Sequence, residues 1–274
     1  VFSLKELGLR PSLLSVVGSD FKEDYEELLK EAELEAEWLI RVDKPTTSFE
    51  NLYDERLERV QYLLSFSSPI PQGVVEECAE GKEGVYIAPI FREVSISTLR
   101  SLVDEEKIAI VEVQGFCRSI SRTRRVYVRP CYELLSALKN CYLVKASLEE
   151  ALAITGMDDA ESAAKKIKEA GAHNVSITLG KEGALLATEN RLLKVKPPEV
   201  KALDPTGAGD VFLAYLSYHL LKEEDPEWSL RVATTAGLAS TRRVGLTGVP
   251  NPKEVEEMMK DFRGNWEVGS SPFP

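Results

Sequence analysis

The sequence predicts an α/β protein with a mostly parallel central sheet, helices on both of its faces and a small antiparallel β-ribbon. From residue 69 onward, short apolar runs alternate with helical stretches over most of the chain. That alternation is typical of a parallel sheet whose strands are joined by helices. Before it, residues 36–68 contain runs with a period of two, separated by turns, which favour an antiparallel ribbon.

The first part of the chain is expected to contain a helix end, a strand, a helix and then the ribbon. Leu4–Gly8 has the pattern of a helix end, Ser12–Val17 that of a strand, and residues 21–31 that of a helix with an acidic outer face. Residues 38–42 alternate and are expected to open the ribbon, which turns at the polar residues 54–56.

Four apolar runs are the expected strands of the central sheet: Gly84–Ala88, Ile108–Val113, Tyr142–Lys145 and Asn174–Thr178. Ligands of open α/β sheets bind beyond the carboxyl ends of the strands. The residues that follow these runs are therefore candidates for function.

Composition excludes several classes of protein. The chain has 274 residues and a net charge of −11, which argues against a nucleic-acid-binding surface, because phosphate binding needs basic residues. The sequence contains no apolar run of about 18 residues, so it predicts no transmembrane helix. Its start has no signal-peptide pattern. The cysteines show no regular spacing and are expected to be reduced thiols of a cytoplasmic protein. They are Cys78, Cys117, Cys131 and Cys141.

The most specific motif is the segment from Asp204 to Asp210, with the sequence Asp-Pro-Thr-Gly-Ala-Gly-Asp, which runs directly into an apolar helical pattern. Small residues at a helix start let a ligand approach the backbone, and the free N–H groups of the first turn bind anions. Asp210 is an unusual residue beside an anion site, but it could accept a proton from an attacking hydroxyl. The alternative is a glycine-rich turn in which Asp210 is only a favourable first-turn charge.

This motif resembles the signature of the ribokinase/PfkB family of sugar kinases. The resemblance implies a ribokinase-like α/β fold, with a kinase domain formed by residues 1–35 and 69–274 and a β-lid formed by residues 36–68. It also implies that the backbone of residues 207–209 (Gly207, Ala208 and Gly209) forms the anion hole for the transferred phosphoryl group and that Asp210 is the catalytic base. The implied reaction transfers the γ-phosphoryl group of ATP to a hydroxyl of a small sugar or polyol.

Gln114 and Arg118 are the expected substrate-binding residues, together with Asp210. Both residues follow the expected strand at Ile108–Val113. The segment resembles Val-Asp-Val-Gln-Gly-x-x-Arg of archaeal sugar kinases of the family. An amide can bind sugar hydroxyls, and a guanidinium can bind phosphate in a forked geometry. A surface loop with solvated arginines is the alternative.

Glu150 is the expected magnesium ligand. The family usually carries Asn-x-x-Glu here, and Glu150 matches the glutamate, whereas Ser147 replaces the asparagine. Mg²⁺ prefers oxygen ligands and retains waters, so one carboxylate and the nucleotide phosphates suffice. The alternative is that Ser147 and Glu150 only cap the following helix.

The remaining nucleotide contacts follow from the resemblance. Thr178, Gly180 and Gly183 match a Thr-x-Gly-x-x-Gly segment beside the nucleotide phosphates, although a simple turn between strands would look the same. Thr206, Gly207 and Gly209 are expected at the phosphates as well. Ala236 and Gly237 are expected near the adenine, with helix packing as the alternative. A monovalent-cation site, formed by Asp204 and Thr206 with Gly245, is a further implication.

Within the family, the sequence segments around Gln114, Ser147 and Thr206 look most like those of myo-inositol kinases, so we expect myo-inositol as the acceptor. Ribose, 2-keto-3-deoxygluconate, fructose phosphates and nucleosides stay open, as do nucleotide donors other than ATP. Relatives begin with a strand and a Gly-Gly segment that contacts the sugar, and we expect that part of the site to lie outside this sequence. A non-catalytic sugar or nucleotide sensor on the same fold is the rival hypothesis. The edge of the β-lid could also form a homodimer.

Overall fold

The computed structural model describes residues 1–54, 59–103, 107–245 and 248–273. Its strands are β1 (Ser12–Val17), β2 (Glu35–Arg41), β3 (Ser48–Tyr53), β4 (Arg59–Ser65), β5 (Gly84–Ile87), β6 (Ile108–Glu112), β7 (Arg118–Ile120), β8 (Val126–Val128), β9 (Leu143–Ser147), β10 (Asn174–Thr178), β11 (Ala184–Ala187), β12 (Arg191–Lys196) and β13 (Glu267–Pro272).

The described helices are α1 (Phe2–Glu6), α2 (Glu23–Glu31), α3 (Gln72–Ala79), α4 (Ile96–Leu102), α5 (Gln114–Cys117), α6 (Tyr132–Leu135), α7 (Leu148–Thr155), α8 (Ala160–Glu169), α9 (Ala208–Leu221), α10 (Pro226–Ser240) and α11 (Pro252–Asp261). A short 3₁₀ helix, η1 (Gly180–Glu182), joins β10 to β11.

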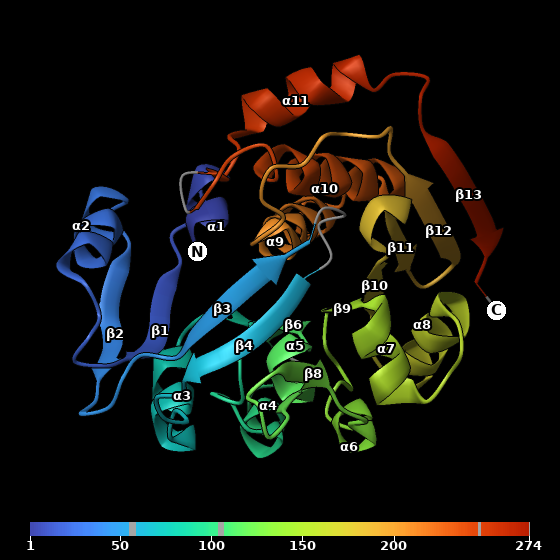
Figure 1. The fold of residues 1–274 in the computed structure, drawn as a ribbon. Coiled ribbons are helices and arrows are strands. Elements are labelled where there is room, and N and C mark those ends of the chain that lie inside the picture. Colours follow the sequence, from blue (N-terminus) through green and yellow to red (C-terminus); the bar gives the residue numbers. More distant parts are fainter. Residues whose placement is uncertain (55–58, 104–106, 246–247, 274) are drawn as a thin grey trace.

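A seven-stranded sheet in the order β13-β12-β11-β10-β9-β6-β5 forms the centre of the fold (Figure 1). Strands β5, β6, β9 and β10 are parallel, as the alternation of strands and helices predicts. Strands β11, β12 and β13 are antiparallel additions at one side. The expected ribokinase-like α/β class, with a mostly parallel sheet, is therefore confirmed.

Both faces of the sheet are buried, because consecutive residues of a strand point to opposite sides. In β9, Leu143 packs into the core under α9, α10 and α11, while Val144 packs into the core under α3, α4, α7 and α8. Neighbouring residues of β6 divide in the same way, with Ile110 on the first side and Val111 on the second. This burial on both faces explains why the strands read as continuous apolar runs.

The prediction for residues 38–42 was wrong. Residues 38–41 lie in β2, which pairs in parallel with β1 through contacts such as Val16↔Ile40, and Val42 follows directly, so they are not part of an antiparallel ribbon. The alternation arises because Ile40 and Val42 pack against the core on the same side as α3 and α4, while Arg41 between them is exposed. Alternation shows that one face is buried, but it does not reveal the direction of the partner strand.

The antiparallel ribbon consists of β3 and β4, which extend across the ends of the sheet strands toward α9 (Figure 1). The expected turn at residues 54–56 lies mostly outside the described residues. A second, shorter hairpin of β7 and β8 lies against β4, where the Leu63 amide donates to the Arg124 carbonyl at 3.0 Å. The Arg124 side chain donates in return to the carbonyls of Leu63 and Leu64, at 2.6 and 2.8 Å.

Two further expectations from composition can be compared with the structure. All four cysteines are free thiols, as their irregular spacing predicts. Within the described ranges, every helix is too short or too polar to cross a bilayer.

Candidate active site

The first turn of α9 meets the parallel strands at their carboxyl ends, where ligands of such sheets bind. Gly207 precedes the helix with φ of +80°, a left-handed conformation that a residue without a Cβ adopts without strain. Before it, the Thr206 amide donates to the Asp204 carboxylate at 2.9 Å, which shapes the turn. The Ala208 amide donates to the Pro205 carbonyl at 3.3 Å, so the predicted anion site would depend mainly on the other N–H groups of the helix start.

Gly209 lies against charged side chains of the sheet. A Cβ at this position would lie 2.8 Å from the Lys145 ammonium and 3.8 Å from a Glu112 carboxylate oxygen. The absence of a side chain at Gly209 is what allows α9 to approach the sheet this closely.

Glu112 and Lys145 form a buried ion pair beneath that turn, and sequence reasoning missed both residues. They are cross-strand neighbours, Glu112 at the end of β6 and Lys145 in the middle of β9, and only 4% and 6% of their side chains are exposed. Charged groups this deeply buried are normally paired, so a lysine and a glutamate inside predicted apolar strands were the available signal.

Asp210 lies beside this pair. The residue is exposed to solvent, although the protein around it reduces the hydration of its carboxylate. This desolvation, together with the neighbouring Glu112 carboxylate, raises the pKa of Asp210 to about 6, while Lys145 opposes part of the rise. A carboxylate with a pKa near the working pH is suited to accept a proton from a hydroxyl.

Gln114 and Arg118 lie at the two ends of α5, directly after β6. Arg118 is buried, not solvated: its guanidinium donates to the Ile90 carbonyl at 3.0 Å and lies 5.5 Å from the ring centre of Phe49 on β3. The surface-loop alternative therefore does not hold for Arg118, whereas its contact with substrate stays a prediction. Arg124, by contrast, is engaged by the backbone of β4.

Glu150 and Ser147 form a complete capping box at the start of α7. The Glu150 carboxylate accepts from the Ser147 amide at 2.8 Å, and the Ser147 hydroxyl accepts from the Glu150 amide at 3.3 Å. This cap uses one carboxylate oxygen of Glu150, so the second is available to a metal or its water. Among the described residues no three His, Cys, Asp or Glu side chains gather as a metal cage, so Mg²⁺ would depend on the donor's phosphates for further ligands.

Thr178 ends β10 beside Ser147 of β9, and Gly180 and Gly183 bound the turn of η1. The turn joins two antiparallel strands, which is the arrangement of the simpler alternative. The assignment of these three residues to the nucleotide phosphates stays a prediction.

Ala236 and Gly237 lie on α10. Ala236 is fully buried in the core, and a Cβ at Gly237 would lie 3.2 Å from the Ala208 carbonyl. Both positions fit the helix-packing alternative, and their contact with adenine stays a prediction. Gly245 has φ of +75°, and no observation tests its predicted cation contact or those of Asp204 and Thr206.

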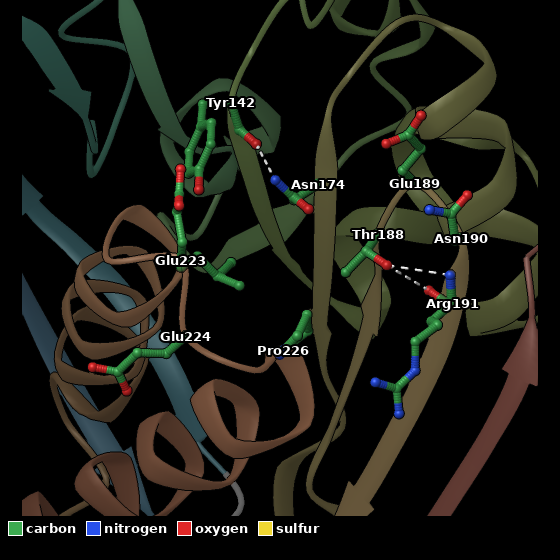
Figure 2. A pocket seen from close by; sticks show the side chains of 10 residues that line it. Tyr142, Asn174, Thr188, Glu189, Asn190, Arg191, Glu223, Glu224 and Pro226 are labelled. Atoms are coloured by element: carbon green, nitrogen blue, oxygen red, sulfur yellow. Dashed lines mark hydrogen bonds between the residues drawn. The ribbon is translucent and has the colours of Figure 1, made fainter.

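A pocket of about 390 Å³ lies at the opposite, amino-terminal ends of β9 and β10 (Figure 2). Two hydrogen bonds lie within its lining: Asn174 donates to the Tyr142 carbonyl at 3.0 Å, and Thr188 donates to the Arg191 carbonyl at 3.2 Å. The residues that line the pocket do not include those of the motif at the start of α9.

Curated proteins similar to this chain include two kinases. A 1-phosphofructokinase of Escherichia coli is 42% identical over 96 residues, which are 34% of this chain and 31% of that protein. A 2-dehydro-3-deoxygluconokinase of Thermoproteus tenax is 33% identical over 111 residues, 39% of this chain and 33% of that protein. The chain thus matches about a third of the length of these curated relatives.

Solved structures share the fold over nearly the whole chain. A pyrophosphate-dependent kinase in the ribokinase family has a TM-score of 0.77 at 21% identity, with 94% of this chain and 89% of that chain covered. The nucleoside kinase of Methanocaldococcus jannaschii has a TM-score of 0.73 at 18% identity, with 95% and 86% covered. The model of the pfkB family of carbohydrate kinases matches residues 1–254. This chain therefore belongs to the pfkB carbohydrate kinase family.

Proposed function

We propose that the protein is an ATP- and Mg²⁺-dependent kinase that phosphorylates a hydroxyl group of a small sugar or polyol. The observation that carries the proposal is the position of Asp210 in the first turn of α9, where a carboxylate with a raised pKa stands at the amino-terminal end of the helix. An anion-binding protein has no use for that carboxylate, whereas a phosphoryl-transfer enzyme needs a base for the attacking hydroxyl.

The proposed step is an in-line displacement. The acceptor oxygen forms a bond to the γ-phosphorus, the bond from that phosphorus to the oxygen bridging to the β-phosphate breaks, and the acceptor proton moves to Asp210. The backbone N–H groups of residues 207–209 stabilise the charge on the transferred group. Glu150 would hold Mg²⁺, which supplies charge neutralisation at the donor phosphates. Gln114 and Arg118 orient the acceptor from the end of β6.

We propose that the β3–β4 ribbon acts as the lid, within the predicted division of residues 36–68 from the kinase domain. Its tip reaches the segment before α9, where the Tyr53 hydroxyl is hydrogen-bonded to the Thr206 hydroxyl at 2.8 Å. Phe49 covers Arg118 from the same strand. A lid closed in this way would exclude water, which otherwise competes with the acceptor for the γ-phosphoryl group.

Tyr53→Phe is expected to uncouple the reaction. The variant loses one hydrogen bond between lid and loop, worth about 0.5–1.5 kcal/mol. The ratio of ATP hydrolysed to acceptor phosphorylated should therefore rise by about three- to tenfold. The measurement compares inorganic phosphate release with formation of phosphorylated acceptor in the same reaction.

The matched control is Tyr62→Phe, which removes a hydroxyl from the same ribbon at a residue that meets the β7–β8 hairpin through its backbone pairing with Arg125. It should leave the ratio unchanged. Equal uncoupling in both variants would show that the Tyr53–Thr206 contact has no special role.

We propose myo-inositol as the first acceptor to test. Support comes from the sequence forms noted above and from the fold shared with a pyrophosphate-dependent myo-inositol kinase, which has a TM-score of 0.75 at 20% identity. The curated relatives are named for different acceptors, a fructose phosphate and a deoxygluconate, so those and ribose and nucleosides remain alternatives. We further propose a cytoplasmic protein, a homodimer through the lid, and a monovalent-cation site at Asp204 and Thr206.

The decisive experiment measures turnover for a panel of acceptors with protein expressed from its full-length gene. The acceptors are myo-inositol, ribose, 2-keto-3-deoxygluconate, fructose 1- and 6-phosphates and adenosine, each with Mg²⁺ and either ATP or pyrophosphate. One strongly preferred acceptor would support the kinase and name its substrate. Binding of ATP without turnover of any acceptor would favour the rival sensor hypothesis.

A further inference from the structure

A buried ion pair stands directly behind the proposed base, and the reaction described above does not use it. Glu112 and Lys145 face each other across β6 and β9 and are almost inaccessible to solvent. An ion pair at such a position costs more desolvation than it returns unless its geometry is good, and apolar residues of similar volume often stabilise a fold as well. Its presence at the active site therefore calls for a functional explanation.

The pair contacts the helix start that carries the base. The Lys145 ammonium occupies the space beside the Cα of Gly209, and the Glu112 carboxylate is close enough to repel the negative charge of Asp210. Both charges thus lie against the first turn of α9. The Lys145 ammonium lies beside its backbone, and the Glu112 carboxylate acts on the carboxyl group of the proposed base.

We propose that Glu112 and Lys145 are positioning residues, which fix the first turn of α9 against the sheet and set the electrostatic environment of Asp210. The proposal rests on the assignment of Asp210 as the base. Neither residue needs to touch the acceptor for this role. Glu112 favours the protonated form of Asp210, and Lys145 limits that effect so that the carboxylate stays available near neutral pH.

Other charged groups around Asp210 come from several elements. The Arg118 guanidinium on β7 interacts favourably with the Asp210 carboxylate. The Tyr86 hydroxyl on β5 is buried and has no hydrogen-bond partner among the described residues, and this burial, with smaller contributions from the Glu112 and Asp210 carboxylates, raises its pKa. None of these groups forms a buried ion pair with Glu112, so the effect of Lys145 on that carboxylate is the dominant one.

The test is a titration of the Asp210 side chain in four proteins. Its ¹³C carboxyl signal, assigned by its absence from Asp210→Asn, is followed by NMR in the wild type, Glu112→Gln, Glu112→Asp and the double variant Glu112→Gln/Lys145→Met. In Glu112→Gln the Lys145 ammonium faces Asp210 without a competing carboxylate, so the titration midpoint should fall by about one pH unit or more.

The other two variants separate charge from packing. Glu112→Asp keeps the charge and should titrate close to the wild type. The double variant removes both charges and should lie between the wild type and Glu112→Gln, because the opposing effects of the two residues are lost together. This variant also keeps the test valid if Glu112→Gln fails to fold, since it leaves no buried charge without a partner. An Asp210 midpoint unchanged in Glu112→Gln, or unchanged in the double variant when the single one does not fold, would overturn the proposal.

A second readout links the pair to catalysis. The acid limb of the kcat/KM profile should move by the same amount as the NMR midpoint in each variant. Because the NMR titration needs no acceptor, it tests the pair even if no kinase activity is found, and that absence would count only against the proposed function. A moved midpoint with an unmoved acid limb would remove Asp210 from the role of base and overturn the positioning role with it.

Discussion

Asp210→Asn is expected to lower kcat by about 10²- to 10⁴-fold, which is the usual contribution of a general base. The asparagine side chain has nearly the same shape, but its amide cannot accept the acceptor's proton. The anion site formed by the α9 backbone is untouched, so the Kd of the nucleotide should stay within about threefold of the wild type. The measurement combines steady-state turnover with calorimetric titration of ATP.

Asp261→Asn is the matched control, because Asp261 is exposed at the end of α11. It should leave both turnover and ATP affinity unchanged. If Asp210→Asn retained more than about a tenth of the wild-type kcat, Asp210 would be a first-turn charge of α9 and not the base.

Lys145→Met is expected to lower the free energy of unfolding by about 3–5 kcal/mol, the cost of removing one partner from a buried ion pair. Methionine fills a similar volume, so the loss arises from the Glu112 carboxylate, which is left buried beside Asp210 without its counter-ion. Urea unfolding at neutral pH, followed by circular dichroism, measures the change.

The control for this loss is Lys196→Met, which breaks the exposed pair between Lys196 and Glu182 at 3.0 Å. Solvent screens that pair, so the urea midpoint should change little. The double variant Glu112→Gln/Lys145→Met should recover most of the stability lost in Lys145→Met. A Lys145→Met protein as stable as the wild type would show that the pair contributes nothing to the fold.

The sequence predicted those parts of the fold that depend only on neighbouring residues in the chain. The strands at Ser12–Val17 and Asn174–Thr178 begin and end where their apolar runs do. The start of α9 after Gly207 also follows from the sequence, because a glycine before an apolar helical pattern marks a helix start. The parallel partner of β2 was not predictable in this way, because strand direction depends on residues far away in the chain.

The site was predictable only in part, for a similar reason. Asp210 and Glu150 belong to contiguous motifs and can be recognised in the sequence. Glu112 and Lys145 are 33 residues apart, and only the pairing of β6 with β9 brings them together. Arg124 is a further contact that the sequence does not reveal, because its guanidinium donates to two backbone carbonyls of β4, about 60 residues away in the chain.

The contact between Arg124 and β4 depends little on the side chains of the ribbon. Arg124 holds β4 through the main-chain oxygens of Leu63 and Leu64, and main-chain oxygens are present whatever the side chains are. Substitutions at either leucine therefore leave the attachment intact. The exposed side chains of the ribbon can therefore change while the ribbon stays attached to the same hairpin.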